Sequence, residues 1–132
     1  MNIYLITVNI LTLLAFFLHT FIGDKELKLI EPDANNDPQF LKQEKWTMAR
    51  TGWHWISVDL LLATIGLGII NFTDYLDCKE LLLKILAIYF FIYGLVWIIV
   101  IAISKDFPKN YLKLGQWGLL WLMSGLIYLG LN

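Results

Sequence analysis

The sequence predicts an all-α integral membrane protein in which four antiparallel helices form an up-down-up-down four-helix bundle. Two observations predict this class. Of the 132 residues, 58% are hydrophobic and only 16% are charged, a composition too apolar for a soluble domain of this length. The apolar residues also gather into four blocks of about 20 residues, and a helix of that length crosses a hydrocarbon core ~30 Å thick. Buried strands are shorter, and strands of membrane barrels alternate apolar with polar residues.

One transmembrane domain, residues 1–132, is expected to hold the four helices, over residues 3–23, 52–72, 81–104 and 111–131. The first segment lacks the basic start and the small-residue cleavage site of a signal peptide, so we interpret it as an uncleaved membrane helix. A long first loop follows. In that loop Asp37 is typical of an N-cap and Pro38 of a first helical residue, which predicts a juxtamembrane helix that continues into the second membrane helix. We interpret this helix as an interfacial anchor, with a substrate lid as the alternative.

The basic residues predict the orientation of the helices. The first and third connections carry eight Lys and Arg residues, whereas the second carries only Lys79 and Lys84. The positive-inside rule therefore places the first and third connections in the cytoplasm. We expect a multi-pass protein of the bacterial inner membrane, with both termini and Cys78 outside. The net charge of −1 excludes the strongly basic surface of a nucleic-acid binder, and a single cysteine excludes an intrachain disulfide.

The two histidines are the most informative residues of the chain. His19 closes the first predicted helix and His54 opens the second. Antiparallel helices would place both rings about one turn below the cytoplasmic face. Ionisable side chains at that depth are unfavourable in lipid and usually face a protein interior or a functional site. The sequence therefore predicts that His19 and His54 share one interior site.

Further polar residues are expected near the histidines. Arg50, His54 and Ser57 form one stripe of the second helix, and Asp59 lies deeper on the same helix. Because lipid offers these groups no partner, we expect Arg50 to lie near Asp24 or Glu26. The candidate ligand-binding residues are His19, Asp24, Arg50, Trp53, His54, Ser57, Asp59 and Gln116.

Each candidate also has a structural interpretation. A membrane histidine near an interface is often a hydrogen-bonded structural residue, and Gln116 can join two helices. Tryptophans at this depth form the aromatic belt of many membrane proteins. Asp59 is harder to explain by structure alone, because a carboxyl group inside a membrane helix is paired, protonated or functional.

Two short sequence elements surround the histidines. The first reads Leu18-His19-Thr20 and then Gly23-Asp24, and the second reads RTGWHWIS from Arg50 to Ser57. They resemble the L-H-[ST]-x-x-G-[DE] and R-x-x-W-H-x-x-[ST] elements of a group of small, uncharacterised four-helix bacterial membrane proteins. The resemblance covers the first helix and half of the second, and it implies one site formed by His19, Gly23, Asp24, Arg50, Trp53, His54 and Ser57. It implies no activity, because the group has none assigned.

Three functions fit these observations. The first is a binding or transport module for a divalent metal, a proton or a small ligand, with His19, His54, Asp24 and Glu26 as candidate metal ligands. The second is a bis-histidine haem protein, or an enzyme in which His54 and Asp59 act as acid and base on a lipid-like substrate. The third is a structural subunit that assembles with another copy or with a different membrane protein. We favour the first, with the structural subunit as the alternative, and the sequence does not decide whether the protein is an enzyme.

Overall fold

The computed structural model describes residues 1–33, 39–104 and 109–131, and every regular element within these ranges is a helix. The predicted all-α class is confirmed. Within the described part of the chain, three helices are long and apolar enough to cross a membrane: Ile3–Lys28, Leu41–Phe72 and Lys79–Ile103. The fourth apolar helix, Gln116–Leu129, is shorter, so its membrane span stays a prediction.

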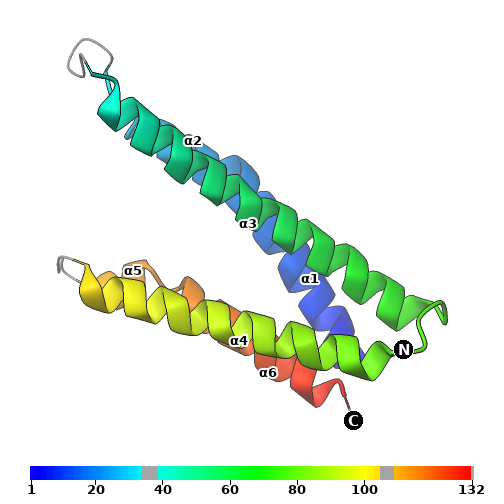
Figure 1. The fold of residues 1–132 in the computed structure, drawn as a ribbon. Coiled ribbons are helices and arrows are strands. Elements are labelled where there is room, and N and C mark those ends of the chain that lie inside the picture. The colour runs from blue at the N-terminus through cyan, green and yellow to red at the C-terminus, as the bar shows by residue number, and fades with distance from the viewer. Residues whose placement is uncertain (34–38, 105–108, 132) are drawn as a thin grey trace. The chain divides into compact units, whose positions relative to one another are not determined.

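The chain divides into two compact units (Figure 1). One contains Ile10–Gly66, and the other contains Met1–Asn9 together with Leu67–Asn132. Each unit is described by itself below. The four-helix antiparallel bundle and the single transmembrane domain stay predictions.

The first unit is built on a helix that extends further than its hydropathy indicates. Helix α1 (Ile3–Phe17) continues into a π-helical segment, η1 (Leu18–Gly23), and then into α2 (Asp24–Lys28). The predicted end at residue 23 is therefore too early. The charged residues of α2 form one further helical turn, since Asp24 and Glu26 lie in its first turn and Lys28 in its last.

Helix α3 (Leu41–Phe72) has 32 residues and is the longest of the described elements. The predicted juxtamembrane helix and the second membrane helix are thus one continuous helix. The predicted N-cap Asp37 and the following Pro38 lie outside the described residues.

Contacts at three levels show that the two helical segments of this unit run antiparallel. The hydroxyl of Thr64 lies 2.9 Å from that of Thr12, which is fully buried. Toward the other end, Trp53 contacts His19, and the Trp46 indole N–H donates to the Leu27 carbonyl at 3.1 Å. Residues later in the α1–α2 segment therefore contact residues earlier in α3. Figure 1 shows α3 alongside α1 and α2.

The second unit is centred on α4 (Lys79–Ile103) and α6 (Gln116–Leu129), which pack along each other. Gly94 allows a close approach, because a Cβ at this position would overlap the indole of Trp121. Polar contacts accompany the packing. The Ser124 hydroxyl donates to the Ala87 carbonyl at 2.7 Å, and the Trp121 N–H donates to the Phe91 carbonyl at 3.2 Å.

The predicted fourth helix, residues 111–131, is not continuous. Its first part forms the short α5 (Asn110–Lys113), and α6 begins only after Leu114 and Gly115. Glycine is a weak helix former because its unfolded backbone is unusually free. The Leu114 carbonyl is satisfied by the Trp97 indole N–H at 3.0 Å, so a side chain from α4 stabilises the interruption.

Candidate functional site

The π-helical segment Leu18–Gly23 positions the first histidine. In a π-helix the backbone bonds reach one residue further than in an α-helix, and such segments are frequent at functional sites. His19 lies in the segment and makes a reciprocal contact with Trp53 on α3. The Trp53 N–H donates to the His19 carbonyl at 2.9 Å, and His19 Nε2 lies 3.0 Å from the Trp53 carbonyl. Because a carbonyl only accepts, Nε2 carries the proton in this contact.

The His19 and Trp53 rings also stack. Their centroids are 4.0 Å apart and their planes differ by 7°. Gly23, one turn further along, is buried against the same indole, and a Cβ there would overlap the six-membered ring. The conformation of Trp53 is therefore fixed by stacking on the imidazole, by its hydrogen bond, and by the missing side chain of Gly23.

Asp24, in the first unit, is the centre of a charged cluster that lies between α2 and the first half of α3. Its oxygens accept two hydrogen bonds from Arg50, from Nε at 2.7 Å and from the terminal nitrogen at 2.9 Å. The predicted proximity of Arg50 and Asp24 is confirmed. Such a bidentate pair is short and directional because both partners are charged. Lys28 Nζ lies 3.3 Å from the same carboxylate, whose side chain is only 15% exposed.

The second histidine joins this cluster. His54 Nε2 lies 3.1 Å from Asp24 Oδ1, and the His54 side chain is 41% exposed. An ionised carboxylate accepts but does not donate, so the contact places the ring proton on Nε2. Within the described part of the chain, the other ring nitrogen, Nδ1, has no partner. His54 is therefore a partly exposed ring with one nitrogen bonded to Asp24, whereas His19 is held by Trp53.

Arg50 is supported from its other side by a tryptophan. Its guanidinium carbon lies 5.2 Å from the centre of the Trp46 ring, within the range of a cation–π contact. The Trp46 N–H in turn is bonded to the Leu27 carbonyl on α2. The sequence did not single out Trp46 or Lys28 as site residues. Lys28 was detectable, since it follows Asp24 by four residues, the spacing at which helical side chains meet.

The remaining candidates lie at different places. Ser57 is 4% exposed, and its buried hydroxyl has no hydrogen-bond partner among the described residues. Asp59 lies five residues past His54 on α3 and is half-buried. Gln116 is exposed at the start of α6, in the second compact unit. The participation of Asp59 and Gln116 in a shared site stays a prediction.

The geometry does not support a metal centre or a bis-histidine haem site. No group of three or more His, Cys, Asp or Glu side chains within the described ranges can hold a metal ion. Of the four candidate ligands, only Asp24 and His54 come together, because His19 Nε2 contacts a carbonyl and Glu26 is exposed. Nε2 of both histidines is already occupied by a protein acceptor.

Comparisons of the chain with protein-family models, with curated proteins and with solved structures found no match. The resemblance to small four-helix bacterial membrane proteins therefore stays a prediction.

Proposed function

We propose that this chain is a small integral membrane protein whose functional site is the Asp24–Arg50–His54 cluster, and that this site binds and releases a proton at His54. The observation that carries the proposal is the contact between His54 Nε2 and Asp24, made by a ring that stays partly exposed. Imidazole is the side chain whose ordinary titration falls within the physiological pH range.

The cluster assigns a distinct role to each member. Arg50 donates a hydrogen bond to each oxygen of Asp24 and so fixes the orientation of this carboxylate on α2. Asp24 then holds the proton of His54 on Nε2, as the carboxylate of an acid–base pair orients its histidine. Nδ1 becomes the proton acceptor. A proton added at Nδ1 leaves the contact of Nε2 with Asp24 in place.

Three long apolar helices support placement in a membrane. The distribution of Lys and Arg supports a cytoplasmic position for the cluster. A proton acceptor there exchanges with the cytoplasm, so the proposed site senses or transmits cytoplasmic pH. Metal binding is not part of this proposal, because the oxygens of Asp24 already face three donors.

Nitrogen NMR of the imidazole rings tests this proposal on the full chain in detergent or nanodiscs. In wild-type protein at alkaline pH, we expect His54 to carry its proton on Nε2 and to gain one on Nδ1 when the sample is acidified. Asp24→Ala removes the acceptor and should weaken this tautomer preference, and His19→Gln, which assigns the resonances, should leave it in place. A His54 ring that carries its proton on Nδ1 at alkaline pH, or that never gains a second one, would falsify the proposal.

A second function, that of a structural subunit for membrane assemblies, is favoured by a different observation. In the first unit, side-chain hydrogen bonds join the α1–α2 segment to α3, and the two together form a helical hairpin. These bonds lie at four levels: Thr12–Thr64, His19–Trp53, Asp24–Arg50 and Leu27–Trp46. A ladder of this kind stabilises a hairpin whether or not it binds a proton. Under this alternative, Arg50→Ala lowers the melting temperature, and the titration of His54 has no effect on any property of the protein.

A further inference from the structure

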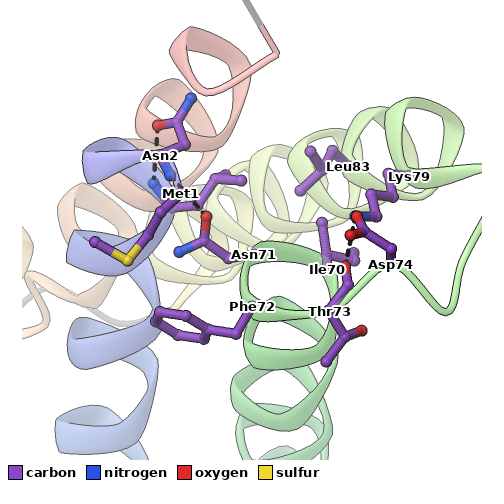
Figure 2. Close-up of a pocket in the computed structure, with 10 residues that line it drawn as sticks. Met1, Asn2, Ile70, Asn71, Phe72, Thr73, Asp74, Lys79 and Leu83 are labelled. Carbon is purple, nitrogen blue, oxygen red and sulfur yellow. Dashed lines mark hydrogen bonds and ion pairs between the residues drawn. The ribbon is translucent and has the colours of Figure 1, made fainter.

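A cavity of about 520 Å³ lies in the second compact unit, where the start of α1, the end of α3 and the start of α4 meet (Figure 2). Its floor is apolar, because Leu5, Ile70 and Leu83 line it and are almost completely buried. Its other side is polar. The cavity is thus amphipathic, and none of its residues belongs to the histidine cluster.

Asn71 supplies a hydrogen-bond donor at this cavity. Its amide oxygen accepts the backbone N–H of Asn2 at 2.8 Å, which fixes which end of the amide is the nitrogen. That nitrogen, Nδ2, is buried and has no partner among the described residues. In Figure 2 the amide oxygen faces Asn2 and the nitrogen points away from it, on the side of Met1 and Phe72. A buried donor without an acceptor is unfavourable, so a ligand that offers an acceptor here would be stabilising.

Lys79 supplies a positive charge at the rim of the same cavity. Its ammonium group donates to the Thr73 carbonyl and, at 2.8 Å, to Asp74. The hydrogen bond from Lys79 lowers the pKa of the Asp74 carboxyl. The Asp74 side chain is nevertheless fully exposed, and exposed ion pairs contribute little free energy. Lys79 can therefore exchange Asp74 for a bound anion at small cost.

The side chains beside these donors indicate the rest of the ligand. Met1 is 93% exposed and Phe72 is 59% exposed, so both apolar groups are open to a ligand chain. A ligand that carries an anion at one end and an apolar body at the other satisfies the donors and covers the apolar groups together.

We propose that this cavity binds a membrane phospholipid, with Lys79 Nζ as the donor to its phosphate, Asn71 Nδ2 as the donor to a second oxygen of the same lipid, and the acyl chains along Phe72. The proposal rests on the membrane placement but not on the proton site. In the predicted orientation the bound lipid belongs to the outer leaflet, since the connection from Thr73 to Cys78 is outside.

Native mass spectrometry of the delipidated full chain with added phosphatidylglycerol measures this binding. Lys79→Ala should weaken it about tenfold, the size expected for a lost charge-assisted hydrogen bond. Asn71→Asp keeps an acceptor for Asn2 but replaces the donor with a negative charge that repels the oxygens of the lipid, and should weaken binding at least as much. Asp74→Asn removes the competitor for Lys79 and should leave binding equal or tighter.

Lys84→Ala is the matched control, because Lys84 pairs with Glu80 and does not line the cavity. If Lys79→Ala and Lys84→Ala weaken phosphatidylglycerol binding equally, the proposed site is wrong. It is also wrong if the wild-type protein binds diacylglycerol, which lacks the phosphate, as tightly as phosphatidylglycerol. Displacement of the lipid by millimolar inorganic phosphate would assign the site to free phosphate instead and overturn the lipid. Circular dichroism confirms that each variant is folded. Loss of lipid binding with normal titration of His54 would leave the proton site untouched.

Discussion

At the scale of single residues, an imidazole, an indole and a glycine pack tightly against one another. His19 and Trp53 each use a side-chain N–H to satisfy the backbone carbonyl of the other. Gly23 leaves the space in which the indole lies. None of the three residues can change size without displacing another.

Gly23→Ala is therefore expected to destabilise the protein. The added methyl group overlaps the Trp53 ring, and overpacking of this kind typically costs about 1–3 kcal/mol. The melting temperature in detergent is the measurement. Gly66→Ala is the control, because a Cβ at Gly66 meets nothing within 4 Å, and alanine there should be neutral or stabilising by about 0.5–1 kcal/mol. Equal effects of the two substitutions would contradict the packing described for Gly23.

Asp24→Asn is expected to lower the melting temperature, because the charge-assisted hydrogen bonds are weakened and Arg50 would keep its charge without a counterion. Glu26→Gln removes an exposed carboxylate two residues away and should change stability by less than about 0.5 kcal/mol. Thermal melts of both variants give the comparison. A larger loss for Glu26→Gln would show that Asp24 is not the centre of the cluster.

At the scale of the elements, the sequence predicted the helices well where hydropathy alone decides them. Helix α4 spans Lys79–Ile103, within two residues of the predicted 81–104, because an uninterrupted apolar run has polar residues at both ends. The prediction missed the interruption at Leu114 and Gly115. Glycine is a local signal for such a break, but the Trp97 indole from α4 that bonds the Leu114 carbonyl is a distant donor that no local pattern reveals.

For the candidate site too, the sequence predicted what depends on position along the helices and missed what depends on contacts between distant residues. The pairing of Arg50 with Asp24 was predictable from position, because both lie at the same end of antiparallel helices and lipid offers them no partner. The π-helix was not predictable, since nothing in LHTFIG distinguishes it from an ordinary apolar helix. A metal site was inferred from residue types alone, and residue types do not say which lone pairs are already occupied.

Trp53→Phe tests how far α3 stabilises the π-helix. Phenylalanine retains an aromatic ring for stacking on His19 but cannot donate to the His19 carbonyl. We expect a loss of about 1 kcal/mol and faster amide hydrogen exchange over residues 18–28. Trp55→Phe is the control, because Trp55 is exposed on the same helix. Unchanged exchange in Trp53→Phe would mean that η1 is maintained by its own residues.

At the scale of the whole molecule, the fact to establish is the orientation in the membrane. The apolar helices fit a bilayer by length and composition, and the basic residues favour the first loop inside. The two proposed sites depend on this orientation in opposite ways. The proton site would exchange with the cytoplasm and the phospholipid site with the outer leaflet.

A membrane-impermeant maleimide is expected to label the exposed Cys78 in intact spheroplasts, because the connection that contains it carries the fewest basic residues. The control is Thr47→Cys in a Cys78→Ser background, since Thr47 is exposed near the opposite end of α3 and should react only after lysis. If the Thr47→Cys variant reacts in intact spheroplasts and Cys78 reacts only after lysis, the orientation is the opposite of the predicted one. The proton site would then face the outside, and the phospholipid site the inner leaflet.

The unbroken length of α3 has a mechanical consequence. Its 32 residues span about 48 Å, whereas the hydrocarbon core is ~30 Å thick, so roughly 18 Å of rigid helix extends beyond the core. A helix in a bilayer changes its tilt when the thickness of the bilayer changes. Because α3 is one continuous helix, any such tilt of a spanning α3 would move its end at Leu41 sideways. Segment α2 would move with it, because Trp46 and Arg50 bind Leu27 and Asp24 there.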